Sequence, residues 1–160
     1  MMDGSENSLA EQTIPPPHVT HRVTIDAPRM RVWEALTNIE QLRQWMAEPE
    51  IRMEVAADWK VGGSVVVKGF HHAAFENKGT VLEFDPPNFL RYSQLSSLSR
   101  LPQTPENHTE FEFRLTEESG QTVFELTMRG FPTDSIYRHL DFYWRVTLGI
   151  LKQFIETSRP

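Results

Sequence analysis

Residues 110–128 read EFEFRLTEESGQTVFELTM, and this stretch decides the fold. Apolar and polar side chains alternate over 111–115 and again over 122–128, which is the period of a strand with one buried face. The polar residues 117–121 between the two runs include Ser-Gly and favour a hairpin turn. An antiparallel hairpin with one wet face and one apolar face needs another element to cover the apolar side. The wet face is expected to carry cross-strand charge pairs among Arg91, Glu112, Arg114, Glu125 and Arg129.

The cover is predicted as a helix over 134–157, with Asp134 as its cap. Its apolar residues fall into two adjoining stripes at helical spacing. The first stripe is Ile136, Leu140, Tyr143, Thr147, Ile150 and Phe154, and the second is Trp144, Leu148, Leu151 and Ile155. Together they make an arc that is broader than one flat contact needs, which indicates a curved sheet clasping the helix.

Upstream of the hairpin, the chain predicts strands and two short helices. Residues 19–26 alternate as a strand, and Ala27-Pro28 ends it, with Asp26 as a cap for the helix that follows. Asn38 is expected to cap a second short helix. Further strands are predicted at 51–55, 64–70, 79–84 and 88–93. The pattern is therefore α+β: a curved antiparallel sheet of about seven strands, two short helices after the first strand, and a long C-terminal helix.

Composition narrows the class of protein. The chain has 160 residues, enough for one domain, and its formal net charge of −6 disfavours nucleic-acid binding. It has no cysteine, which excludes disulfides and thiolate chemistry. No apolar run approaches the roughly 20 residues of a membrane span, and the first residues lack the features of a signal peptide. These observations favour a cytoplasmic protein that binds neither nucleic acid nor membrane.

The N-terminal segment differs from the rest of the chain. Residues 1–18 are polar and include Pro15-Pro16-Pro17. Such a segment buries too little apolar surface to offset its ordering entropy. We expect a disordered tail over 1–18 and a single domain over 19–160.

A set of ordered landmarks resembles a known family. They are Ala27-Pro28, the run from Val32 to Thr37, Leu42 to Trp45, Asp58, Gly62-Gly63, Gly79-x-Val81, Phe84 to Pro87, Leu90-x-Tyr92, Gly130-Phe131 and the helix from Phe142 to Glu156. In this order the chain resembles the START-like (SRPBCC) superfamily with its helix-grip fold, and within it the bacterial homologues of the activator of Hsp90 ATPase. The resemblance implies the fold. It implies no single activity, because members include lipid carriers, cyclases, hormone receptors and proteins without a known role, and no universal catalytic motif carries over.

A helix lying across a curved sheet favours a cavity for an apolar ligand with one polar end. The candidate lining side chains are inward residues of the strands and of the middle of the last helix, together with one histidine. They are Tyr92, Phe111, Phe113, Phe124, Leu126, Tyr143, Trp144, Thr147, Leu148 and His72. Tyr92 is also a candidate core residue, since a buried tyrosine hydroxyl needs a partner in protein, water or ligand.

The pair His71-His72 raises the question of a metal site. Neighbours on a strand point to opposite faces, so the two histidines are not expected to chelate one ion together. One of them is expected to face water and the other to line the interior or the mouth of the cavity. We expect no metal and no cofactor.

Three function classes stay open. The first is a binding module for a small apolar or amphipathic ligand. The second is a chaperone-related or stress-related interaction protein, which only the resemblance suggests. The third is an enzyme of the same fold, although G-x-S-x-G, Walker and His-Glu-x-x-His motifs are all absent. A homodimer is a further expectation, with Trp59 or Phe131 marking its surface.

Overall fold

The computed structural model describes residues 14–158, so most of the tail expected over 1–18 lies outside it. Its strands are β1 (His18–Ile25), β2 (Glu54–Ala57), β3 (Ser64–His71), β4 (Ala73–Asp85), β5 (Phe89–Ser96), β6 (Thr109–Glu118) and β7 (Gln121–Arg129). Its α-helices are α2 (Arg29–Thr37), α3 (Ile39–Trp45) and α4 (Asp134–Thr157), and short 3-10 turns are η1 (Pro49–Ile51), η2 (Ser97–Ser99) and η3 (Pro105–Asn107).

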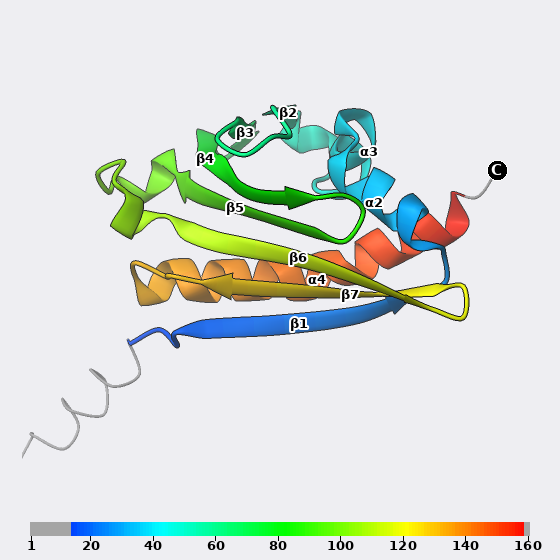
Figure 1. The fold of residues 1–160 in the computed structure, drawn as a ribbon. Coiled ribbons are helices and arrows are strands. Elements are labelled where there is room, and N and C mark those ends of the chain that lie inside the picture. Colours follow the sequence, from blue (N-terminus) through cyan, green and yellow to red (C-terminus); the bar gives the residue numbers. More distant parts are fainter. Residues whose placement is uncertain (1–13, 159–160) are drawn as a thin grey trace, which may run out of the picture.

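The seven strands form one antiparallel sheet in the order β1-β7-β6-β5-β4-β3-β2. Figure 1 shows α4 crossing one face of this sheet, with α2 and α3 near the C-terminal half of that helix. The predicted α+β helix-grip fold is confirmed. The predicted hairpin is β6–β7, in which Phe113 pairs with Leu126 and Leu115 with Phe124.

The long helix α4 buries one side against the sheet. Its second predicted stripe is confirmed, because Trp144, Leu148, Leu151 and Ile155 are all buried. The first stripe is partly wrong: Ile150 is exposed, since the sheet reaches less far around the helix than the apolar arc does.

Helix caps differ from the prediction at two of three places. The Asn38 side chain accepts a hydrogen bond from the Gln41 N–H, as expected. The helix α4 is capped instead by Thr133, whose hydroxyl accepts from the Ile136 N–H, and Asp134 lies in its first turn. The helix α2 has Pro28 at its N-cap and no side-chain cap, so the expected role of Asp26 is wrong.

The segment around residues 49–57 also departs from the prediction. Alternation over 51–55 predicted one strand, but Ile51 ends η1, and Arg52 adopts left-handed backbone angles with φ of 53°. This turn delays the start of β2 to Glu54. Periodicity over five residues was too short to separate a turn from a strand. Within residues 14–158, no helix combines the length and the apolar character that crossing a bilayer requires.

Candidate functional site

The space between α4 and the sheet is occupied by a cluster of aromatic rings, which we call the grip cluster: Tyr92, Phe111, Phe113, Phe124 and Trp144. Tyr92 stacks on Phe111 with ring centroids 5.1 Å apart and meets Phe113 edge-on at 5.5 Å. Phe113 in turn contacts Phe124 at 5.2 Å and Trp144 at 5.9 Å. Edge-to-face and offset contacts at these separations are the favoured geometries of aromatic pairs, so the cluster is a packed core.

The structure brings together nine of the ten predicted cavity residues. Besides the grip cluster, Leu126 and Leu148 belong to the same buried core, Thr147 is buried on α4, and Tyr143 packs against the core at its edge. Whether these residues bind a ligand stays a prediction. The tenth, His72, lies elsewhere.

His72 is the single residue between β3 and β4, and its φ of 65° places it in a tight turn. Both His71 and His72 are exposed, and their rings meet edge-on with centroids 4.5 Å apart. The expectation of opposite faces is therefore wrong, because strand alternation ends where the chain reverses direction. His72 does not line the space under α4. Among residues 14–158, no group of three or more histidine, aspartate or glutamate side chains is arranged to hold a metal ion.

The Tyr92 hydroxyl is the unusual polar atom of the grip cluster. The ring is buried, yet the hydroxyl forms no hydrogen bond with any residue of the described part of the chain. Within that part, the one fully enclosed side-chain nitrogen or oxygen without a partner is Arg29 Nε. The Tyr92 hydroxyl therefore retains accessible surface. Burial, together with nearby Tyr143, raises the pKa of Tyr92, so this hydroxyl stays protonated at neutral pH.

A second hydroxyl closes the α3 end of the same space. Tyr143 donates a hydrogen bond of 2.6 Å to the Met46 carbonyl, which links α4 to the residue that ends α3. Burial raises the pKa of Tyr143 to about 12, and a hydrogen bond with the Thr147 side chain opposes that shift. Tyr92, Tyr143 and Thr147 thus supply neutral hydroxyl groups at the edge of an aromatic core.

A buried carboxylate joins α4 to the edge strand β1, and the sequence analysis missed it. Asp141 Oδ1 lies 2.7 Å from His21 Nε2, and Asp141 Oδ2 accepts from Arg145 Nη2 at 2.7 Å. Two signals were available. His21 shares the inward register of Val23 on β1, and Asp141 lies three residues before the buried Trp144. A charged residue on an apolar stripe indicates a buried partner.

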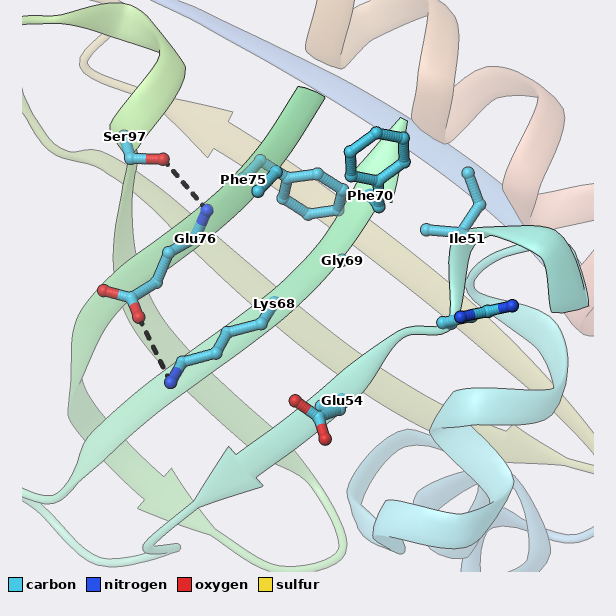
Figure 2. Close-up of a pocket in the computed structure, with 10 residues that line it drawn as sticks. Ile51, Glu54, Lys68, Gly69, Phe70, Phe75, Glu76 and Ser97 are labelled. Carbon is cyan, nitrogen blue, oxygen red and sulfur yellow. Dashed lines mark hydrogen bonds and ion pairs between the residues drawn. The ribbon is translucent and has the colours of Figure 1, made fainter. Parts of the chain in front are cut away.

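A surface hollow of about 510 Å³ lies at the far end of β3 and β4. Figure 2 shows its two parts: Ile51, Phe70 and Phe75 gather at one end, and Glu54, Lys68 and Glu76 lie at the other. We call it the β3 hollow. The absence of a side chain at Gly69 shapes it, since a Cβ there would lie 2.7 Å from Phe75 Cζ and 2.9 Å from Ile51 Cγ2.

The remaining predicted residues lie away from both places. On the wet face, Arg129 pairs with Glu112, as expected, whereas Arg91 binds Glu83 and Glu110, two partners outside the predicted set. Glu125 instead pairs with Arg22 of β1, and Arg114 lies over the ring of Phe89 with its guanidinium carbon 4.7 Å from the centroid.

Neither of the two residues expected to mark a dimer surface is exposed in the monomer. Phe131 is buried and meets the ring of Tyr137. Trp59 stacks on Phe84 with centroids 6.1 Å apart and donates its indole N–H to the Thr37 carbonyl. Large rings near loops packed inward here, so sequence position alone misjudged their exposure.

Comparison with known proteins agrees with this architecture. The family model described as activator of Hsp90 ATPase homolog 1-like protein matches residues 26–156. The solution structure of ChR145 from Cytophaga hutchinsonii is similar, at 33% identity and a TM-score of 0.73, covering 89% of this chain and 96% of that one. No curated protein matches the chain.

Two more distant crystal structures share the fold. MLL2253 from Mesorhizobium loti is 20% identical with a TM-score of 0.71, and CV1439 from Chromobacterium violaceum is 19% identical with a TM-score of 0.74. Each alignment covers 89% of this chain and 99% of the other. The family model and ChR145 carry the assignment: the chain belongs to the family of activator of Hsp90 ATPase homolog 1-like proteins, within the START-like superfamily.

Proposed function

We propose that this chain binds a small molecule between α4 and the sheet, and that the molecule is mostly apolar with one neutral polar end. The Tyr92 hydroxyl is the observation that carries the proposal. A buried tyrosine hydroxyl normally has a hydrogen-bond partner, because removing it from water without one costs free energy. No described residue supplies that partner, and the hydroxyl retains accessible surface, so a polar group of a bound molecule can reach it and hydrogen-bond with it.

The surroundings favour a neutral polar group over a charged one. Around the Tyr92 hydroxyl, the named neighbours are aromatic rings and the hydroxyl of Tyr143. An ion at this depth would lose its hydration without gaining an opposite charge. An alcohol, phenol or carbonyl oxygen can accept a hydrogen bond from the protonated Tyr92 hydroxyl, and its desolvation costs much less free energy than that of an ion.

Entry of such a molecule requires movement, because the grip cluster is packed. The Tyr143–Met46 hydrogen bond of 2.6 Å is one link that closes the α3 end. Breaking it would free the α3 end from the middle of α4. A ligand that fits then replaces ring contacts with its own apolar surface, at roughly 25 cal/mol per Å² before the costs of association.

Paired probes test the proposal. Naphthalene and 2-naphthol differ by one hydroxyl group, and binding of each is measured by quenching of tryptophan fluorescence. We expect 2-naphthol to bind about fivefold more tightly, the value of roughly one net hydrogen bond. The Tyr92→Phe variant should abolish this preference and leave naphthalene binding unchanged.

A second variant locates the site. Leu148→Trp adds volume beside the grip cluster and should prevent binding of both probes, whereas Gln153→Trp on the exposed side of α4 should not. The proposal is wrong if neither probe binds, or if Tyr92→Phe keeps the preference for 2-naphthol. A role in binding a protein partner would then move ahead.

A further inference from the structure

The outer edge of β3 is covered over only part of its length. Strand β2 pairs with β3 from Ala57↔Val65 to Glu54↔Lys68 and then stops. The left-handed turn at Arg52 separates β2 from η1, whose Ile51 side chain lies beside Gly69 without strand pairing. Within residues 14–158, the last residues of β3 therefore have no paired strand on that side.

The hydrogen-bond pattern shows which backbone groups are left open. The Asp58 N–H donates to the Ser64 carbonyl on the β2 side, and the Val81 N–H donates to the Gly63 carbonyl on the β4 side. Backbone groups along an antiparallel strand alternate between its two neighbours. Even-numbered residues of β3 thus face β2, and Phe70 directs its N–H and C=O to the uncovered edge.

The β3 hollow lies beside this open edge. The Phe70 ring is 57% exposed, and Phe75 and Ile51 add apolar surface next to it, as Figure 2 shows. Its volume of about 510 Å³ falls within the range of roughly 300–1,000 Å³ typical of ligand sites. Open backbone groups and apolar side chains therefore occur together in one place.

The opposite edge of the sheet is protected in a way that β3 is not. Strand β1 has Arg22 on its wet face and turns His21 inward to Asp141. Charged and inward-pointing polar side chains are how natural sheets prevent the addition of a foreign strand. At the end of β3, the residue with open backbone groups carries an exposed aromatic ring instead.

We propose that the β3 hollow docks an extended peptide segment of a partner protein, which continues the line of β2 along β3. The segment forms two backbone hydrogen bonds with Phe70 and places an apolar side chain against Ile51 and Phe75. An extended peptide is the matching occupant because it offers a donor and an acceptor at the spacing of a strand. This inference is independent of ligand binding under α4.

The test uses the full chain and a synthetic peptide, acetyl-Thr-Val-Thr-Val-Thr-amide, followed by NMR of the backbone amides. We expect chemical-shift changes centred on Phe70 and its neighbours, together with slower hydrogen exchange of the Phe70 amide. In the control peptide, proline replaces the central threonine. This peptide keeps both valines, whose side chains face Ile51 and Phe75, but lacks the N–H that pairs with Phe70, so it should bind about fivefold more weakly. Equal binding of the two peptides, or shifts centred on β1, would overturn the proposal.

Two substitutions at one position separate the backbone from the ring. Phe70→Ala removes the ring and keeps the N–H, whereas Phe70→Pro removes both. Proline is tolerated where the N–H faces an open edge, so both variants should fold. We expect the proline variant to bind the valine peptide about fivefold more weakly than the alanine variant. Identical affinities of the proline and alanine variants for the valine peptide would show that the open N–H contributes nothing and that the proposal is wrong. Leu148→Trp, which changes the space under α4, should leave peptide binding unchanged.

Discussion

The part of the sheet under α4 and the outer end of β3 and β4 differ in whether their aromatic side chains are buried. In both, apolar side chains extend from the strands. Under α4, Phe111, Phe113 and Phe124 are almost fully buried. Phe111 and Phe113 pack on Trp144, and Phe124 packs on Phe113. At the outer end, Phe70 is 57% exposed.

The difference indicates that the role of an aromatic side chain in this fold depends on whether another element packs over it. A covered ring stabilises the protein through dense packing, and its loss leaves a cavity. An uncovered ring contributes little to folding and is free to meet another molecule. Each of the following predictions tests whether the two regions differ in this way.

The largest effect is expected from Phe113→Ala. Phe113 contacts Tyr92, Phe124 and Trp144, so truncation removes three ring contacts and leaves a void. We expect a loss of about 3–5 kcal/mol in the free energy of unfolding, measured by urea denaturation. A loss below about 1 kcal/mol would mean that the space under α4 is already open.

The same contrast explains which strands and which helix face could be predicted from the sequence. Alternation over 111–115 and 122–128 predicted β6 and β7 with their inward rings, because burial of one face enforces a period of two. The second stripe of α4 followed from helical spacing. These signals are strong where a whole face is covered.

The signals fail where structure depends on a single residue or on pairing between distant segments. The left-handed turn at Arg52 shortened a predicted strand, and a one-residue turn moved His72 to the surface. The contact between His21 and Asp141 joins residues 120 positions apart, which periodicity does not report. Tyr92 was a candidate from sequence, but that its hydroxyl has no hydrogen-bond partner among residues 14–158 is seen only once its neighbours are placed.

The next effect concerns charge in the two regions. Asp141→Asn leaves His21 and Arg145 without their carboxylate, and we expect a loss of about 1–3 kcal/mol in urea denaturation. In the outer region, Glu76→Gln removes the partner of Lys68, an exposed pair at 3.5 Å, and should cost no more than about 0.5 kcal/mol. Equal costs would show that the Asp141 contact is as solvated as the surface pair.

The third prediction concerns how alkaline pH changes the free energy of unfolding through Tyr143, which lies at the edge of the buried region. Its pKa is raised by burial to about 12, so the folded state holds the proton more tightly than the unfolded state does. The resulting stability is present below pH 10 and is lost as pH rises from 10 to 12. Between pH 8 and 11, the wild type should lose about 1 kcal/mol more than Tyr143→Phe does, measured by urea denaturation. Parallel losses would indicate that Tyr143 is solvated.

The smallest effect is expected from Phe70→Ser at the outer end of β3. The Phe70 ring is 57% exposed and lies on an uncovered strand end, so its removal exposes little new apolar surface. Serine keeps the backbone N–H and C=O, and β3 retains its pairing with β4 through the neighbouring residues. We expect the free energy of unfolding to change by no more than about 0.5 kcal/mol. Phe75→Ser is the matched control: its ring is half-buried over Gly69, so its loss should cost measurably more. A loss above about 2 kcal/mol for Phe70→Ser would mean that this ring is covered in solution, and the contrast between the two regions would then disappear.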